Sequence, residues 1–133
     1  MTSFVRASMP LCEVLGIEGV SSSADEVVLE LGYDERLTTA GGLLHGGAVM
    51  ALADASGALC AYLNLPEGAS GTATIESKTN FLGAVRSGTV RARSVPLHVD
   101  STTIVVETEI RLEDRLVAKT TQTQAVIRPA PAP

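Results

Sequence analysis

The sequence is poor in aromatic residues and in positive charge. Its 133 residues include no tryptophan, two tyrosines and two phenylalanines, which excludes the stacking platform on which single-stranded nucleic acids bind. The ten Lys and Arg residues are scattered and are outnumbered by acidic residues, so that the net charge is −5. Because phosphate binding needs clustered cations, we expect no nucleic-acid partner. The length is that of a single domain.

Cysteines and apolar runs are also few. Cys12 and Cys60 lie far apart without a CxxC motif, which fits a reducing compartment, although a single disulfide stays open. The segment "MTSFVRASMPLCEVLG" has no continuous apolar core, so we read no signal peptide. The run from Ala48 to Leu65 is mostly alanine and contains Asp54, which would cost about 2.5–3.5 kcal/mol at a bilayer centre. We therefore expect a buried helix in a cytoplasmic protein with no membrane partner.

The remaining pattern predicts one α+β domain over residues 1–128 and a disordered tail over 129–133. We expect a short helix over 4–15, a strand over 26–31, a loop over 33–44, a long helix from about 46 to 64, and strands over 72–82, 88–99, 103–113 and 116–127. Short connections between strands imply an antiparallel sheet. A long helix with almost no surface charge should be buried nearly all round. The predicted fold is a curved antiparallel sheet wrapped around one long helix.

One acid, Asp54, lies in about the third turn of this helix. At 100° per residue it falls opposite Leu52, which should face the sheet together with Val49, Leu59, Cys60 and Leu63. Its neighbours on that side are small: Gly47, Ala51, Ala58 and Ala61. A cap role belongs to the first turn, and no basic residue lies between 37 and 77, although Lys78 or Arg86 remains as a distant partner. We interpret Asp54 as a functional carboxylate, because buried acids are rarely unpaired.

The tripeptide "HGG" at 45–47 precedes the helix. The first N–H groups of a helix have no intrahelical partner and form a site for a developing oxyanion. Gly46 and Gly47 would let a ligand approach the backbone closely, and His45 could orient it. A flexible helix entry with a structural histidine is the alternative.

Three segments, "GLLHGGAVMALADASG", "TATIESKTNFLGAVRSG" and "PLHVDS", resemble the hotdog-fold acyl-CoA thioesterases, in particular their phenylacetate-degradation and hydroxybenzoyl-CoA groups. The resemblance covers about residues 10–128. It implies hydrolysis of an acyl-CoA thioester without metal or cofactor. It further implies that Asp54 is nucleophile or general base, that the Gly46 N–H polarises the thioester carbonyl, that His45 supports this loop, and that Thr74 helps to place the acid or the water.

Two positions depart from the family pattern. Thr39 stands where many relatives carry Asn or Gln, and Thr102 stands where many carry an Arg that grips CoA phosphate. Arg86 and Arg91 are then the candidates for the CoA phosphates, with surface solvation as the alternative for each. The other candidate substrate contacts are Thr39, Gly47, Ala58, Asn80 and Phe81.

Helix geometry argues for a dimer. Gly46 and Asp54 are eight residues apart, which is about 12 Å along a helix axis at ~1.5 Å per residue. A carbonyl that accepts the Gly46 N–H cannot also lie within about 3–3.5 Å of Asp54 in one subunit. An antiparallel helix from a two-fold partner would close this gap, so we expect a homodimer with shared sites, as in the family, with pairing into a tetramer left open.

The resemblance thus implies an acyl-CoA thioesterase acting on aryl or short- to medium-chain acyl groups. A hotdog-fold hydratase or dehydratase and a non-catalytic acyl-CoA-binding module are the alternatives. Regular alternation along 72–82 would place Thr74 on the face opposite Ile75 and Phe81.

Overall fold

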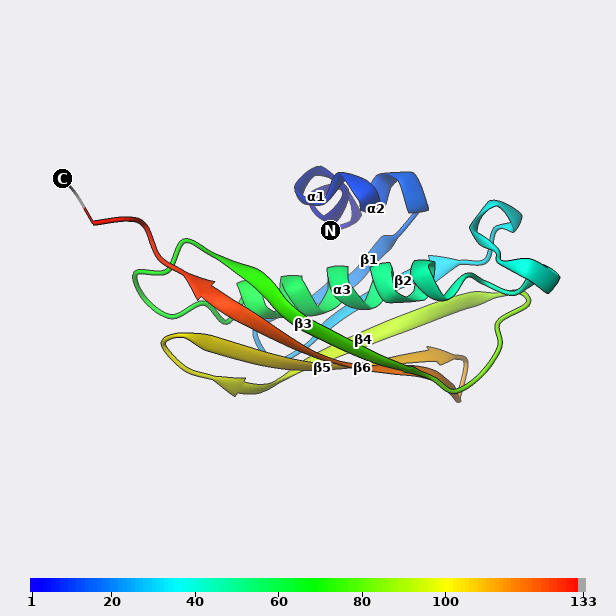
Figure 1. Ribbon diagram of the computed structural model, residues 1–133. Helices are drawn as coiled ribbons and strands as arrows, with labels where there is room; N and C mark the ends of the chain where they lie inside the picture. The colour runs from blue at the N-terminus through cyan, green and yellow to red at the C-terminus, as the bar shows by residue number, and fades with distance from the viewer. Residues whose placement is uncertain (132–133) are drawn as a thin grey trace.

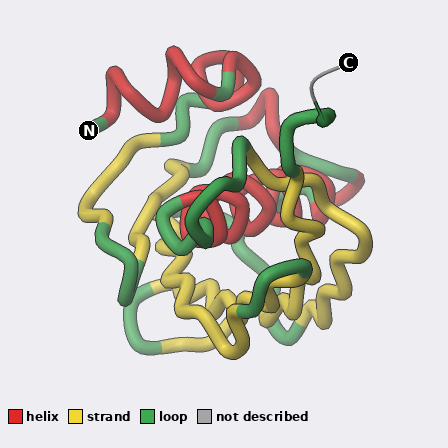
Figure 2. Tube along the Cα trace, turned by 90° about the vertical axis from the view of Figure 1, so that its left-hand side faces the viewer, coloured by secondary structure: helices red, strands yellow, loops and turns green. Residues whose placement is uncertain are grey.

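Six strands form one antiparallel sheet that curves around a long helix (Figure 1). The computed structural model describes residues 1–131. The strands are β1 (Glu18–Ser22), β2 (Val27–Gly32), β3 (Gly71–Phe81), β4 (Thr89–Val99), β5 (Thr103–Leu112) and β6 (Arg115–Ile127), in the order β1-β2-β4-β5-β6-β3. The helices are α1 (Thr2–Ser8), α2 (Pro10–Leu15) and α3 (Gly46–Tyr62). Figure 2 shows the strands passing beneath α3, with α1 and α2 on its other side. The predicted α+β class, with a curved antiparallel sheet around one helix, is confirmed.

The long elements and strand β2 lie within two residues of their predicted bounds, whereas the other short elements differ. The helix expected over 4–15 is divided between α1 and α2, because Pro10 has no N–H with which to continue α1. β1 was not predicted, and the expected loop over 33–44 contains two short 3₁₀ turns, η1 (Glu35–Leu37) and η2 (Ala40–Gly42). The tail predicted over 129–133 lies partly outside the described residues.

Helix α3 buries most of its surface but leaves one face open. Leu52 is fully buried and belongs to the same core as Leu29, Ile104 and Val106 of the sheet. The expectation of burial nearly all round is wrong for one stripe, where three side chains are exposed: Met50, Asp54 and Tyr62.

Two single placements on α3 were also wrong. Ala61 is buried rather than beside Asp54 on the open face. Leu63, expected to face the sheet, follows the last helical residue and is 37% exposed, because the helix has already ended there.

Strand β3 forms one edge of the sheet and pairs only with β6 among the described strands. Its register shifts between Thr74 and Glu76, so that Ile75 is the extra residue of a β-bulge. Thr74 is paired with Gln124 and Phe81 with Ala118, both of which are buried on the α3 side. Thr74 and Phe81 therefore share one face, contrary to the regular alternation predicted from the sequence.

The two cysteines are buried and form no disulfide with each other. Burial raises the pKa of the Cys60 thiol to about 11, and burial is also the main cause that raises the pKa of Cys12. No helix in residues 1–131 is long and apolar enough to cross a bilayer.

Candidate active site

The start of α3 is fixed by the ring of His45. Its Nδ1 accepts a hydrogen bond of 2.7 Å from the Gly47 N–H, so His45 is the N-cap of the helix and its ring proton lies on Nε2. A side chain on Gly47 would crowd this ring, since an added Cβ would lie 2.9 Å from Nδ1. The His45 backbone is held in turn by the Leu37 carbonyl at 2.8 Å. The "HGG" tripeptide thus forms a self-capped helix start.

The capping leaves the Gly46 N–H as the free donor of the first turn. The N–H groups of Gly47, Ala48 and Val49 all bond to His45, through its ring or its carbonyl. Gly46 is the first helical residue, whose N–H has no intrahelical acceptor. The Phe81 ring lies beside it, because a Cβ added to Gly46 would be 3.2 Å from the ring. Together, Gly46 and Phe81 offer a hydrogen-bond donor next to an apolar wall.

Asp54 lies on the open face of α3 and is held from the sheet. Its Oδ1 accepts hydrogen bonds from Gln122 Nε2 at 2.5 Å and from the Thr74 hydroxyl at 3.4 Å. The Thr74 hydroxyl accepts a bond of 2.7 Å from Gln124 Nε2, which directs its own proton toward Asp54. All recorded bonds of this carboxylate within residues 1–131 go to Oδ1. The other oxygen, Oδ2, is available for chemistry.

A groove runs along α3 one helical turn from Asp54. Ala58 lies one helical turn beyond Asp54 on the same face. The groove has a volume of about 460 Å³ and is lined by residues of α1, α3 and the start of β3, with Met9: Phe4, Ser8, Met9, Ala58, Leu59, Tyr62, Gly71 and Thr72. Its walls carry no charged side chain, so the groove suits an uncharged group next to the carboxylate.

Sequence comparisons agree with this geometry. The thioesterase superfamily matches residues 41–119, a segment that includes the helix start, Asp54 and Thr74. A Bacillus subtilis protein named ComA2 and described as an esterase is 36% identical over 119 residues, which cover 89% of this chain and 94% of that protein. This chain belongs to the thioesterase superfamily.

Two further similar proteins extend the comparison. The 1,4-dihydroxy-2-naphthoyl-CoA hydrolase of Escherichia coli is 34% identical over 104 residues, which cover 77% of this chain and 76% of the hydrolase. The crystal structure of a thioesterase from Haemophilus influenzae matches with a TM-score of 0.83 and 33% identity, over 89% of this chain and 82% of that one. The predicted hotdog fold and the predicted enzyme class, a thioester hydrolase, are confirmed.

The structure does not bring all the predicted residues of this thioesterase together. Arg91 lies on the face of the sheet turned away from α3 and is paired with Glu30 at 3.1 Å. Asn80 is on the same outer face, since it is paired in register with Lys119. Arg86 and Thr39 are exposed in loops. The carbonyl of Val85, next to Arg86, accepts a hydrogen bond from the N–H of Leu44, which directly precedes "HGG".

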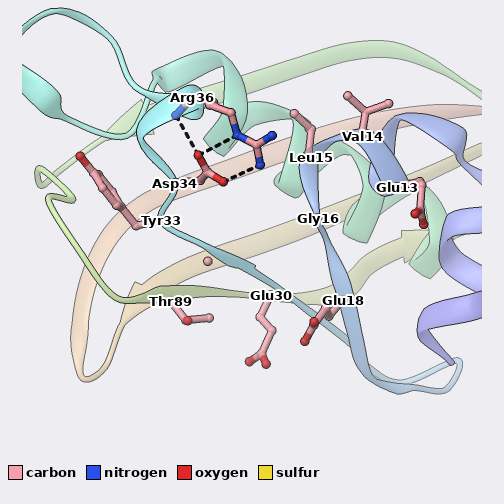
Figure 3. Close-up of a pocket in the computed structure, with 11 residues that line it drawn as sticks. Glu13, Val14, Leu15, Gly16, Glu18, Glu30, Tyr33, Asp34, Arg36 and Thr89 are labelled. Atoms are coloured by element: carbon pink, nitrogen blue, oxygen red, sulfur yellow. Dashed lines mark hydrogen bonds and ion pairs between the residues drawn. The ribbon is translucent and has the colours of Figure 1, made fainter.

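A second hollow, of about 410 Å³, lies where α2, β1 and β2 meet (Figure 3). Its acids are Glu13, Glu18, Glu30 and Asp34. Arg36, the only cation among its described lining residues, is bound to Asp34 at 2.8 Å, and this hydrogen-bonded pair lowers the pKa of Asp34 to about 2. An acidic lining whose one guanidinium is already paired does not suit the phosphates of a CoA ester.

Gln122 and Gln124 were not predicted from the sequence as part of the site. Both side chains are almost completely buried, with 0% and 1% exposure. They lie in "TTQTQ", where Thr and Gln alternate, and this pattern gives no sign of which residues face the core. The one available signal is the presence of long polar side chains in a strand that must pack on an apolar helix.

Proposed function

We propose that the protein hydrolyses an aryl or short- to medium-chain acyl-CoA to the free acid and CoA. The observation that carries the proposal is the combination of two groups on one helix. Asp54 is held through Oδ1 with Oδ2 available, and the Gly46 N–H is the free donor of a capped helix start. Thioester hydrolysis needs a carboxylate near the reacting carbon and a donor for the carbonyl oxygen.

In this mechanism the Gly46 N–H donates to the thioester carbonyl, and this bond strengthens as negative charge develops on the oxygen. Asp54 Oδ2 then acts in one of two ways. As nucleophile it attacks the carbonyl carbon and expels CoA as thiolate, leaving a mixed anhydride that water cleaves. As general base it takes a proton from the water that attacks. Thr74 and His45 position these two groups without reacting.

The groove beside Ala58 supports the acyl preference. Its volume of about 460 Å³ and its uncharged lining fit an aromatic ring or a short to medium alkyl chain. The Escherichia coli relative carries the name of an aromatic acyl-CoA hydrolase, which favours an aryl group. Phe81 and Gly47 are the proposed contacts near the thioester.

A shared site in a homodimer completes the proposal. The ~12 Å between Gly46 and Asp54 along one helix requires a second subunit to bring the two groups to one thioester. Edge strand β3 is eleven residues long, and Ile75, Phe81 and Leu82 on it or at its end are 66%, 53% and 58% exposed. A long exposed edge with apolar side chains is a template for pairing with another chain.

Three further points concern the contact with the CoA phosphates, the need for a cofactor and the location of the protein in the cell. Arg86 is the candidate for a CoA phosphate, because it is exposed and its loop is bonded to the backbone before "HGG". No cofactor takes part in the proposed chemistry. A cytoplasmic location stays a prediction from the sequence.

The test is an acyl-CoA panel assayed for released thiol, with the Asp54→Asn variant beside the wild type. We expect hydrolysis of aryl or short to medium acyl-CoAs, and less than about a tenth of this activity in Asp54→Asn with the melting temperature retained. Hydration of a double bond would indicate the hydratase, and binding without turnover the non-catalytic module. An Asp54→Asn variant with wild-type turnover would contradict the proposed role of the acid.

A further inference from the structure

We propose that Gln122 is a positioning residue that holds the Asp54 carboxylate in its reactive orientation, and that Gly57 makes room for it. The inference rests on the proposed function of Asp54. It concerns a side chain on the last strand of the sheet, 68 residues from the acid in sequence.

The contact between the two side chains has one chemically sensible orientation. Gln122 Nε2 lies 2.5 Å from Asp54 Oδ1 and 3.5 Å from the Thr74 hydroxyl oxygen. Turning the amide over would place its carbonyl oxygen against a carboxylate oxygen, two acceptors in contact. The amide must therefore present its NH₂ group to Asp54 and Thr74. A bond from N–H to a carboxylate is of the charge-assisted, stronger kind.

This orientation leaves the other end of the amide unsatisfied. Gln122 is 0% exposed, and its Oε1 has no hydrogen-bond partner among the described residues. A buried acceptor without a partner is unfavourable for stability. Such a group is retained in a well-packed core where the rest of the side chain serves another purpose. In Gln122 this other purpose is the hydrogen bond that its NH₂ group donates to Asp54.

Gly57 is the second feature that stability alone does not explain. It lies inside the 17-residue helix α3, where glycine is less favourable than alanine. A Cβ on this residue would be 1.9 Å from Gln122 Oε1 and 3.6 Å from the Thr108 hydroxyl. Any larger residue would push the amide away, and its NH₂ group would leave Asp54. The helix thus has a glycine where the amide of Gln122 must fit beneath it.

The expected consequence is for the rate of reaction rather than for binding. Asp54 is exposed on an open helix face, where a short carboxylate would otherwise rotate. Gln122 fixes Oδ1 from beneath, so that Oδ2 is left free for the substrate. Gln122 itself is fully buried and touches no substrate. Its loss should therefore lower kcat and leave KM nearly unchanged.

Two variants test this from opposite sides of the contact. Gln122→Met keeps the length and volume of the side chain but removes the donor. Gly57→Ala keeps Gln122 but displaces it by the steric conflict at Oε1. In each we expect kcat to fall by about 10- to 100-fold, the range for losing a hydrogen bond to a charged group, with KM within about twofold of wild type.

The matched control is Thr120→Val, two residues away on the same face of β6. Thr120 is also fully buried, and its recorded side-chain hydrogen bond goes to the Thr79 hydroxyl rather than to Asp54. We expect its kcat to stay within about twofold of wild type. If Gln122→Met and Gly57→Ala fold and retain wild-type kcat, the inference is wrong. An equal loss of kcat in Thr120→Val would likewise overturn it, because the effect would then be general to the core.

A spectroscopic measurement separates this inference from the proposed function. The side-chain NH₂ signals of Gln122, assigned by their loss in Gln122→Met, should move in the NMR spectrum of Asp54→Asn. Their movement supports the contact even where no acyl-CoA is turned over. Signals that are indifferent to Asp54→Asn would overturn the inference, even in an enzyme whose activity depends on Asp54.

Discussion

Gly46→Pro and Asp54→Asn, placed on separate chains, give the most direct test of a shared site. Gly46→Pro removes the one free N–H at the start of α3, and proline is well accepted at the first position of a helix. Gly46→Ala is its matched control, because it adds the same Cβ beside the Phe81 ring, 3.2 Å away, and keeps the N–H. Loss of an oxyanion donor typically lowers kcat by about 100- to 1,000-fold. We expect this loss in Gly46→Pro and not in Gly46→Ala.

The arithmetic of mixing follows from the geometry of α3. If Asp54 of one chain works with Gly46 of its partner, each inactive homodimer contains no intact site. Equal mixing with random pairing makes about half of the dimers mixed, and each mixed dimer has one intact site of two. About a quarter of wild-type activity should therefore return. If both groups acted within one chain, nothing would return.

In a second mixture, shared sites give the lower activity instead of the higher one. A chain that carries both Gly46→Pro and Asp54→Asn is mixed in equal amount with wild type. If the sites are shared, only the wild-type homodimers are active. The mixture then has about a quarter of the activity of an equal total amount of wild-type protein, whereas unshared sites leave about half of that activity. Thiol release from the best acyl-CoA gives the activity, and native mass spectrometry of chains with tags of different mass verifies exchange. No recovery in the first mixture and half activity in the second would refute the shared site.

Two further predictions follow from the described contacts. Thr74→Ala removes the hydroxyl that links Gln124 to Asp54, so kcat should fall while the melting temperature changes little; wild-type kinetics would assign Thr74 no role. Cys60, whose pKa is raised to about 11, should be about 0.1% ionised at pH 8 and ionise appreciably only as the pH approaches 11. Both Cys60 and the buried Cys12 should therefore react with an aromatic disulfide reagent in guanidinium chloride but not in the native protein, and a fast native reaction of either would contradict this.

The sequence was most informative where a pattern is long. Helix α3 and the four strands after it lie within two residues of prediction, because each has ten or more residues of consistent pattern. β1 was missed because it has five residues, four of them exposed, with two serines among them. "HGG" and Asp54 could be proposed as site candidates because glycines at a helix start and a lone acid in an apolar helix are unusual.

The parts of the site that could not be predicted depend on pairing between distant strands. The β-bulge at Ile75 is visible only in the register of β3 with β6. Regular alternation of side chains along the sequence therefore placed Phe81 and Thr74 on opposite faces. The role of Gln122 depends on the same pairing. Asp54 was expected to be a buried acid but is exposed in the chain, since only the curvature of the sheet decides which face of α3 stays open.

The order of strands also determines when the site can form during folding. β3 is made directly after α3, yet its only recorded partner within the described chain is β6, the last strand, and Gly71 pairs with Ile127. The pairs β1–β2, β4–β5 and β5–β6 are local and can close early, whereas the β3–β6 pair has to close the longer loop that contains β4 and β5. On a ribosome Asp54 would emerge long before Gln122. Its carboxylate would be hydrated, without its hydrogen bond from Gln122, until synthesis is almost finished. Assembly of the carboxylate and its partners should therefore be among the last events of folding, and a chain that ends before β6 should keep part of its sheet but lack hydrolytic activity altogether.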